Sequence, residues 1–270
     1  MKLQLIPAMR GVLWVRQGFN LFFRHPLAFA GLFATFLFGL FIFSLLPAVG
    51  SVLLLTALPL ASLGFMIGSR MALQGEFPLP RVFIEPLRRG RPRLIAMLQL
   101  GLIYAGATAL ILWLSDVIDS GALDSLMRTM GDSKSTTDDI QQQLSNPNLQ
   151  LGLLTRFGLS GLLSVPFWHA PALVHWGGHS AGKALFFSLI ACWRNRGAFA
   201  LYGLTWVAAI LSFALLANLV FGLLGQVQLV ALAAMPASLI FSTVFYVSLY
   251  FTFADCFEMN GNVPESTTAA

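Results

Sequence analysis

The stretch that decides the fold is Pro166–Tyr202, which reads PFWHAPALVHWGGHSAGKALFFSLIACWRNRGAFALY. Its first part, Phe167–Val174, is apolar and is expected to end a membrane span, with the flanking prolines as kinks. Gly177-Gly178 then breaks the helix. The basic Arg194–Arg196 marks the next membrane edge, and a further span is expected to start at Ala198. The stretch is therefore an elbow between two spans.

A second, shorter helix is predicted inside this elbow. Ser180 is a suitable N-cap for a helix that begins near Ala181. Its apolar residues recur at helical spacing, while Lys183 and Arg194 point elsewhere. We expect this helix to lie at the membrane surface. Its apolar side comprises Leu185, Phe186, Leu189 and Trp193.

Composition places the chain in the membrane class. Apolar residues make up 57% of the 270 and charged residues 10%, whereas soluble domains carry roughly 25% charged residues. The net charge of +5 is expected to reflect topology, so no nucleic-acid partner is predicted. Cys192 and Cys256 both fall on the predicted cytoplasmic side, so a disulfide is not expected.

Six stretches are apolar enough to cross a hydrocarbon core that needs about 20 residues. The predicted fold is an all-α, polytopic membrane bundle with two additional interfacial amphipathic helices on the cytoplasmic side. It forms a single membrane domain over residues 1–254, followed by a cytoplasmic tail at 255–270. The predicted spans are 26–46, 49–69, 94–114, 157–174, 198–221 and 227–253, with an outside loop at 115–155.

The distribution of basic residues predicts the orientation. Thirteen of the 16 lysines and arginines fall in the segments assigned to the cytoplasm. Only Arg128, Lys134 and Arg156 fall outside. Because short loops rich in Lys and Arg stay in the cytoplasm, both termini are predicted to be cytoplasmic. The predicted location is the bacterial inner membrane.

The first amphipathic helix is predicted over Met9–Arg24. Apolar residues at helical spacing oppose a face that carries arginine, glutamine and asparagine, which suits an anionic membrane surface. The alternative is a cytoplasmic extension that packs on the bundle. Basic residues expected to contact phospholipid headgroups are Arg10, Arg16, Arg24, Arg88, Arg89, Arg91, Arg93, Lys183, Arg194 and Arg196. The proline-rich Arg70–Arg93 loop is interpreted as a topology determinant that contacts phospholipid, with docking of a specific partner as the alternative. For the protein as a whole, a membrane-protein partner or a homo-oligomer stays open.

The outside loop is acidic and mostly polar. Leu123, Leu126, Met127 and Met130 recur at three- and four-residue spacing, which predicts a short amphipathic helix at the outer surface. Residues 131–148 are polar and are expected to be mobile. The loop holds six aspartates but lacks the D-x-D-x-D-G spacing of a calcium site, so a solvated face is the simpler interpretation.

An internal repeat is a further hypothesis. The segment FRHPLAFA at Phe23–Ala30 resembles WRNRGAFA at Trp193–Ala200. Each follows a predicted surface helix and opens a span. The proposed units are Met9–Ser69 and Ala181–Phe253, with Pro59 and Pro236 in equivalent spans. Both units start inside, so the repeat would be parallel. Convergence of apolar composition is the alternative.

The sequence offers little chemistry. Residues Gly177–Ala184 nearly spell a P-loop, but Ala184 replaces the hydroxyl that holds magnesium and no strand precedes the stretch, so a helix break is the preferred interpretation. His169, His175 and His179 lack a fourth ligand nearby in sequence and are interpreted as structural. The predicted span interiors carry no Asp, Glu, Lys or Arg, which disfavours an ion-coupled transporter. No catalytic residue, cofactor or metal site is predicted.

Three short motifs carry a family resemblance: WHAPALV at Trp168–Val174, KALFFS at Lys183–Ser188 and WRN at Trp193–Asn195. They resemble an uncharacterised family of proteobacterial six-span inner-membrane proteins, and the likeness covers nearly the whole chain. More distantly, the layout is similar to the membrane domain fused to some glycerophosphodiester phosphodiesterases. The resemblance implies a helical inner-membrane bundle and carries over no catalytic or binding residue.

Two functions remain open from the sequence. The first is a non-catalytic membrane protein that acts through lipid or protein contacts, as an accessory subunit or envelope-organising factor. The second is a carrier or channel-like permease for a neutral or lipid-like solute. A packed centre with an apolar side groove would favour the first function. A polar, water-accessible cavity at mid-membrane would favour the second.

Overall fold

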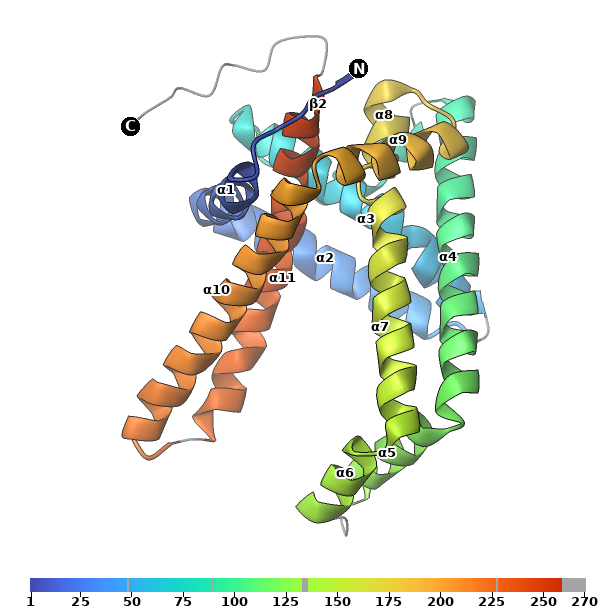
Figure 1. Ribbon diagram of the computed structural model, residues 1–270. Helices are drawn as coiled ribbons and strands as arrows, with labels where there is room; N and C mark the ends of the chain where they lie inside the picture. The colour runs from blue at the N-terminus through green and yellow to red at the C-terminus, as the bar shows by residue number, and fades with distance from the viewer. Residues whose placement is uncertain (48, 89, 133–135, 227, 259–270) are drawn as a thin grey trace.

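The computed structural model describes residues 1–47, 49–88, 90–132, 136–226 and 228–258, and it is a helical bundle (Figure 1). The long helices are α2 Pro26–Ser44, α3 Val49–Leu73, α4 Arg91–Asp119, α7 Pro147–Phe167, α10 Arg196–Leu223 and α11 Leu229–Cys256. The shorter elements are β1 Lys2–Leu3, α1 Arg10–Arg24, η1 Pro80–Phe83, η2 Glu85–Arg88, α5 Ala122–Gly131, α6 Thr137–Leu144, α8 Ala170–Gly177, α9 Ala181–Arg194 and β2 Phe257–Glu258.

Six candidate membrane spans follow from the length and hydropathy of these helices. Each overlaps one of the six spans predicted from the sequence, so the predicted class of membrane helical bundle is confirmed. Both described ends of the chain lie at one end of the bundle, which also holds α8 and α9 (Figure 1). We call this the ribbon end, after the β1–β2 pair, and the opposite end the α5–α6 end.

The segment predicted as an outside loop, 115–155, is largely helical: it holds the short helix predicted around Leu123–Met130, and it also holds α6, the end of α4 and the start of α7. The fourth span begins at Pro147 and the third ends at Asp119. In the stretch expected to be mobile, α6 begins with a capping box in which Thr136 and Asp139 satisfy each other's backbone N–H groups. Residues 133–135 lie outside the described chain. Leu126 of α5 is buried against Leu149, so this helix packs on α7.

The break in the fourth span lies at Trp168-His169, between the two prolines of the sequence motif. Pro166 is in the last turn of α7, and Pro171 is in the first turn of α8, where its missing N–H costs nothing. The side chain of Ser188 in α9 accepts from the His169 backbone N–H at 3.0 Å. It also donates to the carbonyl of Val165 at 3.1 Å. One hydroxyl thus satisfies backbone groups that the break releases.

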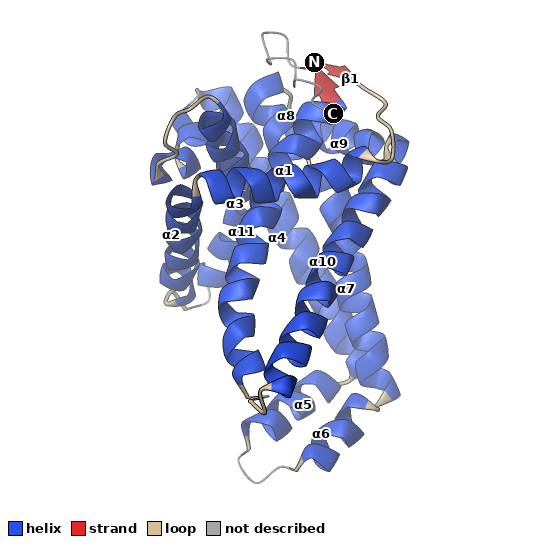
Figure 2. Ribbon diagram, turned by 90° about the vertical axis from the view of Figure 1, so that its left-hand side faces the viewer, coloured by secondary structure: helices blue, strands red, loops and turns tan. Residues whose placement is uncertain are grey.

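Helix α1 packs tightly on α10 and α11 and lies across them (Figure 2). A Cβ atom at Gly11 would lie 2.1 Å from the Ala198 carbonyl oxygen, and one at Gly18 would lie 2.8 Å from the Ser248 Cβ. Only glycine permits these approaches. Trp14 between them is fully buried. The packing matches the alternative of an extension that docks on the bundle, whereas contact with lipid stays a prediction.

Helix α9 begins at Ala181, as predicted, and lies across the ribbon end (Figure 1). The Ser180 side chain makes no capping hydrogen bond, although its backbone is extended as an N-cap requires. The side of α9 that faces the protein is built of small residues. They are Ala181, Ala184, Ser188, Ala191 and Cys192. The large apolar side chains of Phe186, Leu189 and Trp193 are exposed.

The two ends of the chain are joined at the ribbon end. Strands β1 and β2 pair antiparallel, with Lys2 opposite Glu258. Nearby, the Asn195 amide binds the backbone of Gln4 and Ile6, each at 3.0 Å. The predicted tail therefore starts later than expected, because Asp255 belongs to α11. Residues 259–270 lie outside the described chain.

The internal repeat stays a hypothesis. Each proposed unit has a crosswise helix followed by two long helices, and Pro59 and Pro236 lie inside the second long helix of each. The crosswise helices pack differently, however. Helix α1 contacts α10 and α11 of the other unit, whereas α9 contacts α7 and α8.

Candidate functional site

A cavity of about 790 Å³ lies where α7, α9, α10 and α11 meet. Its volume falls in the range of roughly 300–1,000 Å³ that is usual for ligand pockets. The cavity is bounded by spans, so it opens beside helices whose outer surfaces must face hydrocarbon. Leu215 and Met235, on these helices, are examples of such exposed apolar side chains.

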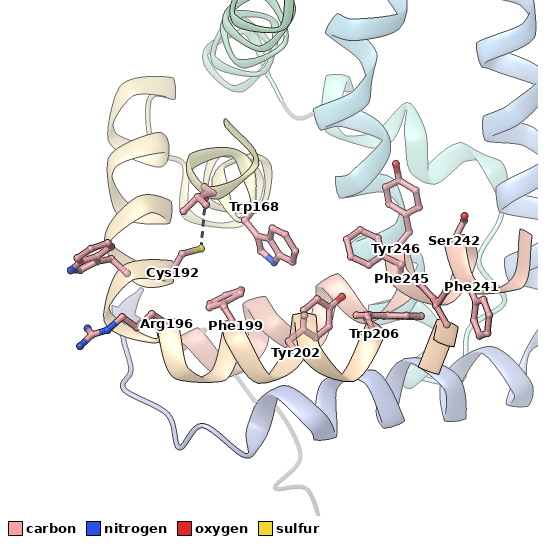
Figure 3. Close-up of a pocket in the computed structure, with 14 residues that line it drawn as sticks. Trp168, Cys192, Arg196, Phe199, Tyr202, Trp206, Phe241, Ser242, Phe245 and Tyr246 are labelled. Atoms are coloured by element: carbon pink, nitrogen blue, oxygen red, sulfur yellow. Dashed lines mark hydrogen bonds between the residues drawn. The ribbon is translucent and has the colours of Figure 1, made fainter. Parts of the chain in front are cut away.

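Aromatic side chains from α10 and α11 line the cavity (Figure 3). Phe199, Tyr202 and Trp206 recur at three- and four-residue spacing on α10, so they share one helical face. Phe241 and Phe245 do the same on α11. Trp206 meets Phe245 with ring centroids 5.9 Å apart. The rings form a continuous apolar wall.

Trp168, at the break between α7 and α8, closes one side of the cavity. Its ring meets Phe199 at 5.6 Å and Phe245 at 5.9 Å, edge to face in both cases. The Trp168 indole N–H donates to the Thr252 hydroxyl at 3.1 Å. Thr252 is also 3.2 Å from Nε2 of His169. These hydrogen bonds hold the Trp168 ring in place and direct its indole N–H away from the cavity.

Tyr202 is fixed in the same way. Its phenol oxygen is 2.6 Å from the Ser248 hydroxyl, and Ser248 donates onward to the Phe245 carbonyl at 2.7 Å. Because Trp168 and Tyr202 both direct their polar atoms to α11, they offer the cavity mainly hydrocarbon. No acidic side chain lines it in the described part of the chain.

One charged side chain is among the described residues that line the cavity, and it lies at the ribbon end. Arg196, in the first turn of α10, places its guanidinium 5.9 Å from the centre of the Trp193 ring. Both side chains are exposed. Beside them, Cys192 is buried and donates weakly to the Val165 carbonyl at 3.7 Å. Burial raises the pKa of Cys192 to about 12, so the thiol is neutral and is not a nucleophile.

The arrangement suits binding rather than reaction. An apolar wall with one cation at its rim can hold an alkyl chain while the cation meets an anionic group. The described lining has no pair of side chains that could act as nucleophile and base. No group of three His, Cys, Asp or Glu side chains that could hold a metal occurs among the described residues.

The predicted headgroup residues lie on elements of the ribbon end. Side chains of this set that are exposed there are Arg16, Arg24, Arg88, Arg91, Lys183, Arg194 and Arg196. Arg93 is half-buried, and Arg89 lies outside the described residues. Arg10 is half-buried as well, and its contact with lipid stays a prediction. Its guanidinium binds Asp255 through two nitrogens, at 2.7 and 2.6 Å, so its charge is committed within the protein.

The glycine-rich stretch and the histidines have structural surroundings. Gly177-Gly178 ends α8, and Gly178 has φ +66°, which glycine adopts without strain. The stretch thus joins two helices. His169 is fully buried beside Thr252, and the ring of His175 lies against Trp176. The ring of His179 meets Phe187 instead.

Sequence reasoning missed the aromatic cavity. The spacing of Phe199, Tyr202 and Trp206 was a usable signal, and so was that of Phe241 and Phe245. In a span that is apolar on every side, however, such a stripe does not stand out by hydropathy. Only the packing of α10 and α11 against Trp168 shows that the rings face one space.

Comparison with known proteins supports the membrane class. The chain is 35% identical over 264 residues to a probable inner membrane protein of Burkholderia thailandensis. The match covers 95% of this chain and 94% of the relative. No family model matches the sequence, and no solved structure matches it. The likeness to phosphodiesterase-fused domains stays a prediction.

Proposed function

The chain belongs to the family of this probable inner membrane protein of Burkholderia thailandensis, and from that premise we propose that it is a non-catalytic inner-membrane protein that holds a membrane lipid. In this proposal an acyl chain occupies the aromatic cavity and an anionic headgroup meets Arg196. The protein then acts as an accessory subunit or envelope-organising factor. The observation that carries the proposal is the apolar cavity that opens between spans with a cation at its rim.

The surrounding surface supports a lipid as the occupant. Exposed Phe186, Leu189 and Trp193 of α9 suit contact with the membrane interface just beside the rim. In this proposal the ribbon end faces the cytoplasm, where anionic lipids attract its arginines. A carrier would instead need a polar, water-accessible path, so the apolar lining favours the accessory role. The protein partner of that role remains part of the proposal.

Filling the cavity tests the proposal. Gly203 lines the cavity, and a Cβ atom there meets nothing within 4 Å, so Gly203→Leu adds bulk to the cavity without a clash at the backbone. Gly222 lies on the same helix, is equally open, and does not line the cavity. Gly222→Leu is therefore the matched control.

The measurement is quenching of tryptophan fluorescence by phospholipid with brominated acyl chains, added to delipidated protein in detergent. Trp168, Trp193 and Trp206 line the cavity and report on it, whereas exposed Trp113 does not line it and reports on bulk lipid in every variant. We expect lipid binding about tenfold weaker in Gly203→Leu, since overfilling a cavity costs roughly 1–3 kcal/mol. Equal quenching in wild type, Gly203→Leu and Gly222→Leu would refute the lipid site.

A further inference from the structure

A second cavity, of about 580 Å³, lies between the end of α3, the η1–η2 segment and α8. It shares no lining residue with the aromatic cavity. Its walls are polar, and three arginines contribute to them: Arg70, Arg81 and Arg88. Glu76 and Glu85 also line it, which leaves a formal charge of +1.

The cavity is built on fixed elements. The η1–η2 segment is anchored by Val82, which is fully buried, and by Pro86. The Phe83 ring packs on Phe65 at 5.5 Å and fills the space above Gly64, where a Cβ atom would lie 2.2 Å from it. The positions of Arg81 and Arg88 therefore follow from packing on α3 on either side of Phe83.

Arg70 is held in place from the other side. Its guanidinium lies 5.7 Å from the centre of the Trp176 ring of α8. An arginine that stacks on an aromatic face keeps its N–H donors at the edge of the guanidinium plane. Arg70 is half-buried, whereas Arg81 and Arg88 are exposed. One half-buried and two exposed arginines thus line one cavity.

We propose that this cavity binds a phosphate-bearing group. Arginine forks match phosphate oxygens with paired hydrogen bonds, and three of them can surround one phosphate. The near balance of charge makes such binding depend on these paired bonds rather than on a broad positive field. The phosphate can belong to a phospholipid headgroup or to a free phosphate compound. The inference does not rest on the aromatic cavity.

The test uses the full chain with Arg70→Gln, and Arg16→Gln as control, since Arg16 is exposed on α1 and lines neither cavity. Two probes distinguish a free phosphate compound from a lipid headgroup. Binding of inorganic phosphate is measured by titration calorimetry in detergent, and binding of phosphatidylglycerol is measured by native mass spectrometry. We expect Arg70→Gln to weaken binding of at least one probe about tenfold while Arg16→Gln does not. Loss of phosphate binding indicates a free compound, and loss for the lipid alone indicates a headgroup.

Two further variants keep the test decisive. If Arg70→Gln unfolds, Arg81→Gln and Arg88→Gln replace it, because exposed side chains are seldom needed for folding. Gly203→Leu should leave this site intact, so failure here is distinguishable from failure of the lipid cavity. Absence of binding by either probe, or an equal loss in Arg16→Gln, would overturn the proposal.

Discussion

Asp255 connects the two ends of the chain through one carboxylate. It accepts hydrogen bonds from Arg10 through both oxygens and from the Trp14 indole N–H at 2.6 Å. Trp14 is fully buried, and the Asp255 side chain is 19% exposed. Bonds with charged partners are the stronger kind. The hydrogen bond to Asp255 raises the pKa of Arg10, so the guanidinium stays charged at physiological pH.

Asp255→Ala is expected to lower the free energy of unfolding by about 2–3 kcal/mol. The change leaves the Trp14 N–H buried without an acceptor, which costs roughly 1–3 kcal/mol, and removes a charge-assisted pair from Arg10. Arg10 still reaches water, so the loss stays below that of a fully buried pair. The change in unfolding free energy is measured by unfolding the protein with sodium dodecyl sulfate in mixed micelles, with circular dichroism as the signal.

Asp116→Ala is the matched control for this prediction. Asp116 also pairs with an arginine, Arg156, but its side chain is 62% exposed. Exposed pairs contribute about 0–1 kcal/mol, so this variant should unfold nearly as the wild type does. Losses of similar size in the two variants would contradict the special position of Asp255.

The Asp255 cluster was beyond prediction from the sequence. Arg10 and Asp255 lie 245 positions apart. Because basic residues gather at the cytoplasmic edge of the membrane, the sequence predicted that Arg10 contacts lipid headgroups. The aromatic cavity was missed for the same reason, since Trp168 meets Phe245 only through the packing of distant helices. Residue types alone do not show which distant partners meet.

Helices were better predicted than contacts. Length and hydropathy suffice to identify six spans, because hydrocarbon imposes both on any spanning helix. The start of α7 was misplaced by ten residues, at Phe157 instead of Pro147. Arg156 and the polar residues before it lower the local hydropathy. Contact with α5, through Leu149, nevertheless keeps that part helical.

Helix α9 distributes its residues as a membrane-surface helix would. Small residues face the protein. The exposed arc carries Phe186, Leu189 and Trp193 on one side and Lys183, Arg194 and Phe187 on the other. Leu189 lies roughly 120° around the helix from Lys183, and both are exposed. If α9 lies at the membrane surface, Leu189 faces acyl chains and Lys183 faces water.

Spin labels at these two positions test the placement of α9. The background carries Cys192→Ala and Cys256→Ala, and Leu189→Cys or Lys183→Cys is labelled in liposomes. We expect oxygen, which concentrates in hydrocarbon, to relax the label at position 189 more strongly than the label at position 183. A water-soluble nickel chelate should relax the label at position 183 more strongly than the label at position 189. Equal access of the nickel chelate to both labels would place α9 in water.

At the scale of the whole molecule, the arrangement of helices separates two chemically different ends. The ribbon end gathers α8 and the arginine-bearing α1, α9 and start of α4, while α5 and α6 lie at the other end (Figures 1 and 2). The sequence predicted this separation through the positive-inside rule. It could not predict that α1 packs on α10 and α11. Gly11 and Gly18 permit a close approach, but their presence in the sequence does not show which helix approaches.

The orientation across the membrane is the last prediction. In the same cysteine-free background, Gln142→Cys reports on the α5–α6 end and Gln74→Cys on the ribbon end; both glutamines are exposed. A membrane-impermeant maleimide added to intact spheroplasts should label position 142 and spare position 74, because the arginine-rich end is retained in the cytoplasm. Lysis should then expose position 74 to the reagent, which controls for its reactivity. Labelling of position 74 in intact spheroplasts would show that the orientation is the reverse of the predicted one. It would also place the arginines of the second cavity, Arg81 and Arg88, away from the cytoplasmic leaflet.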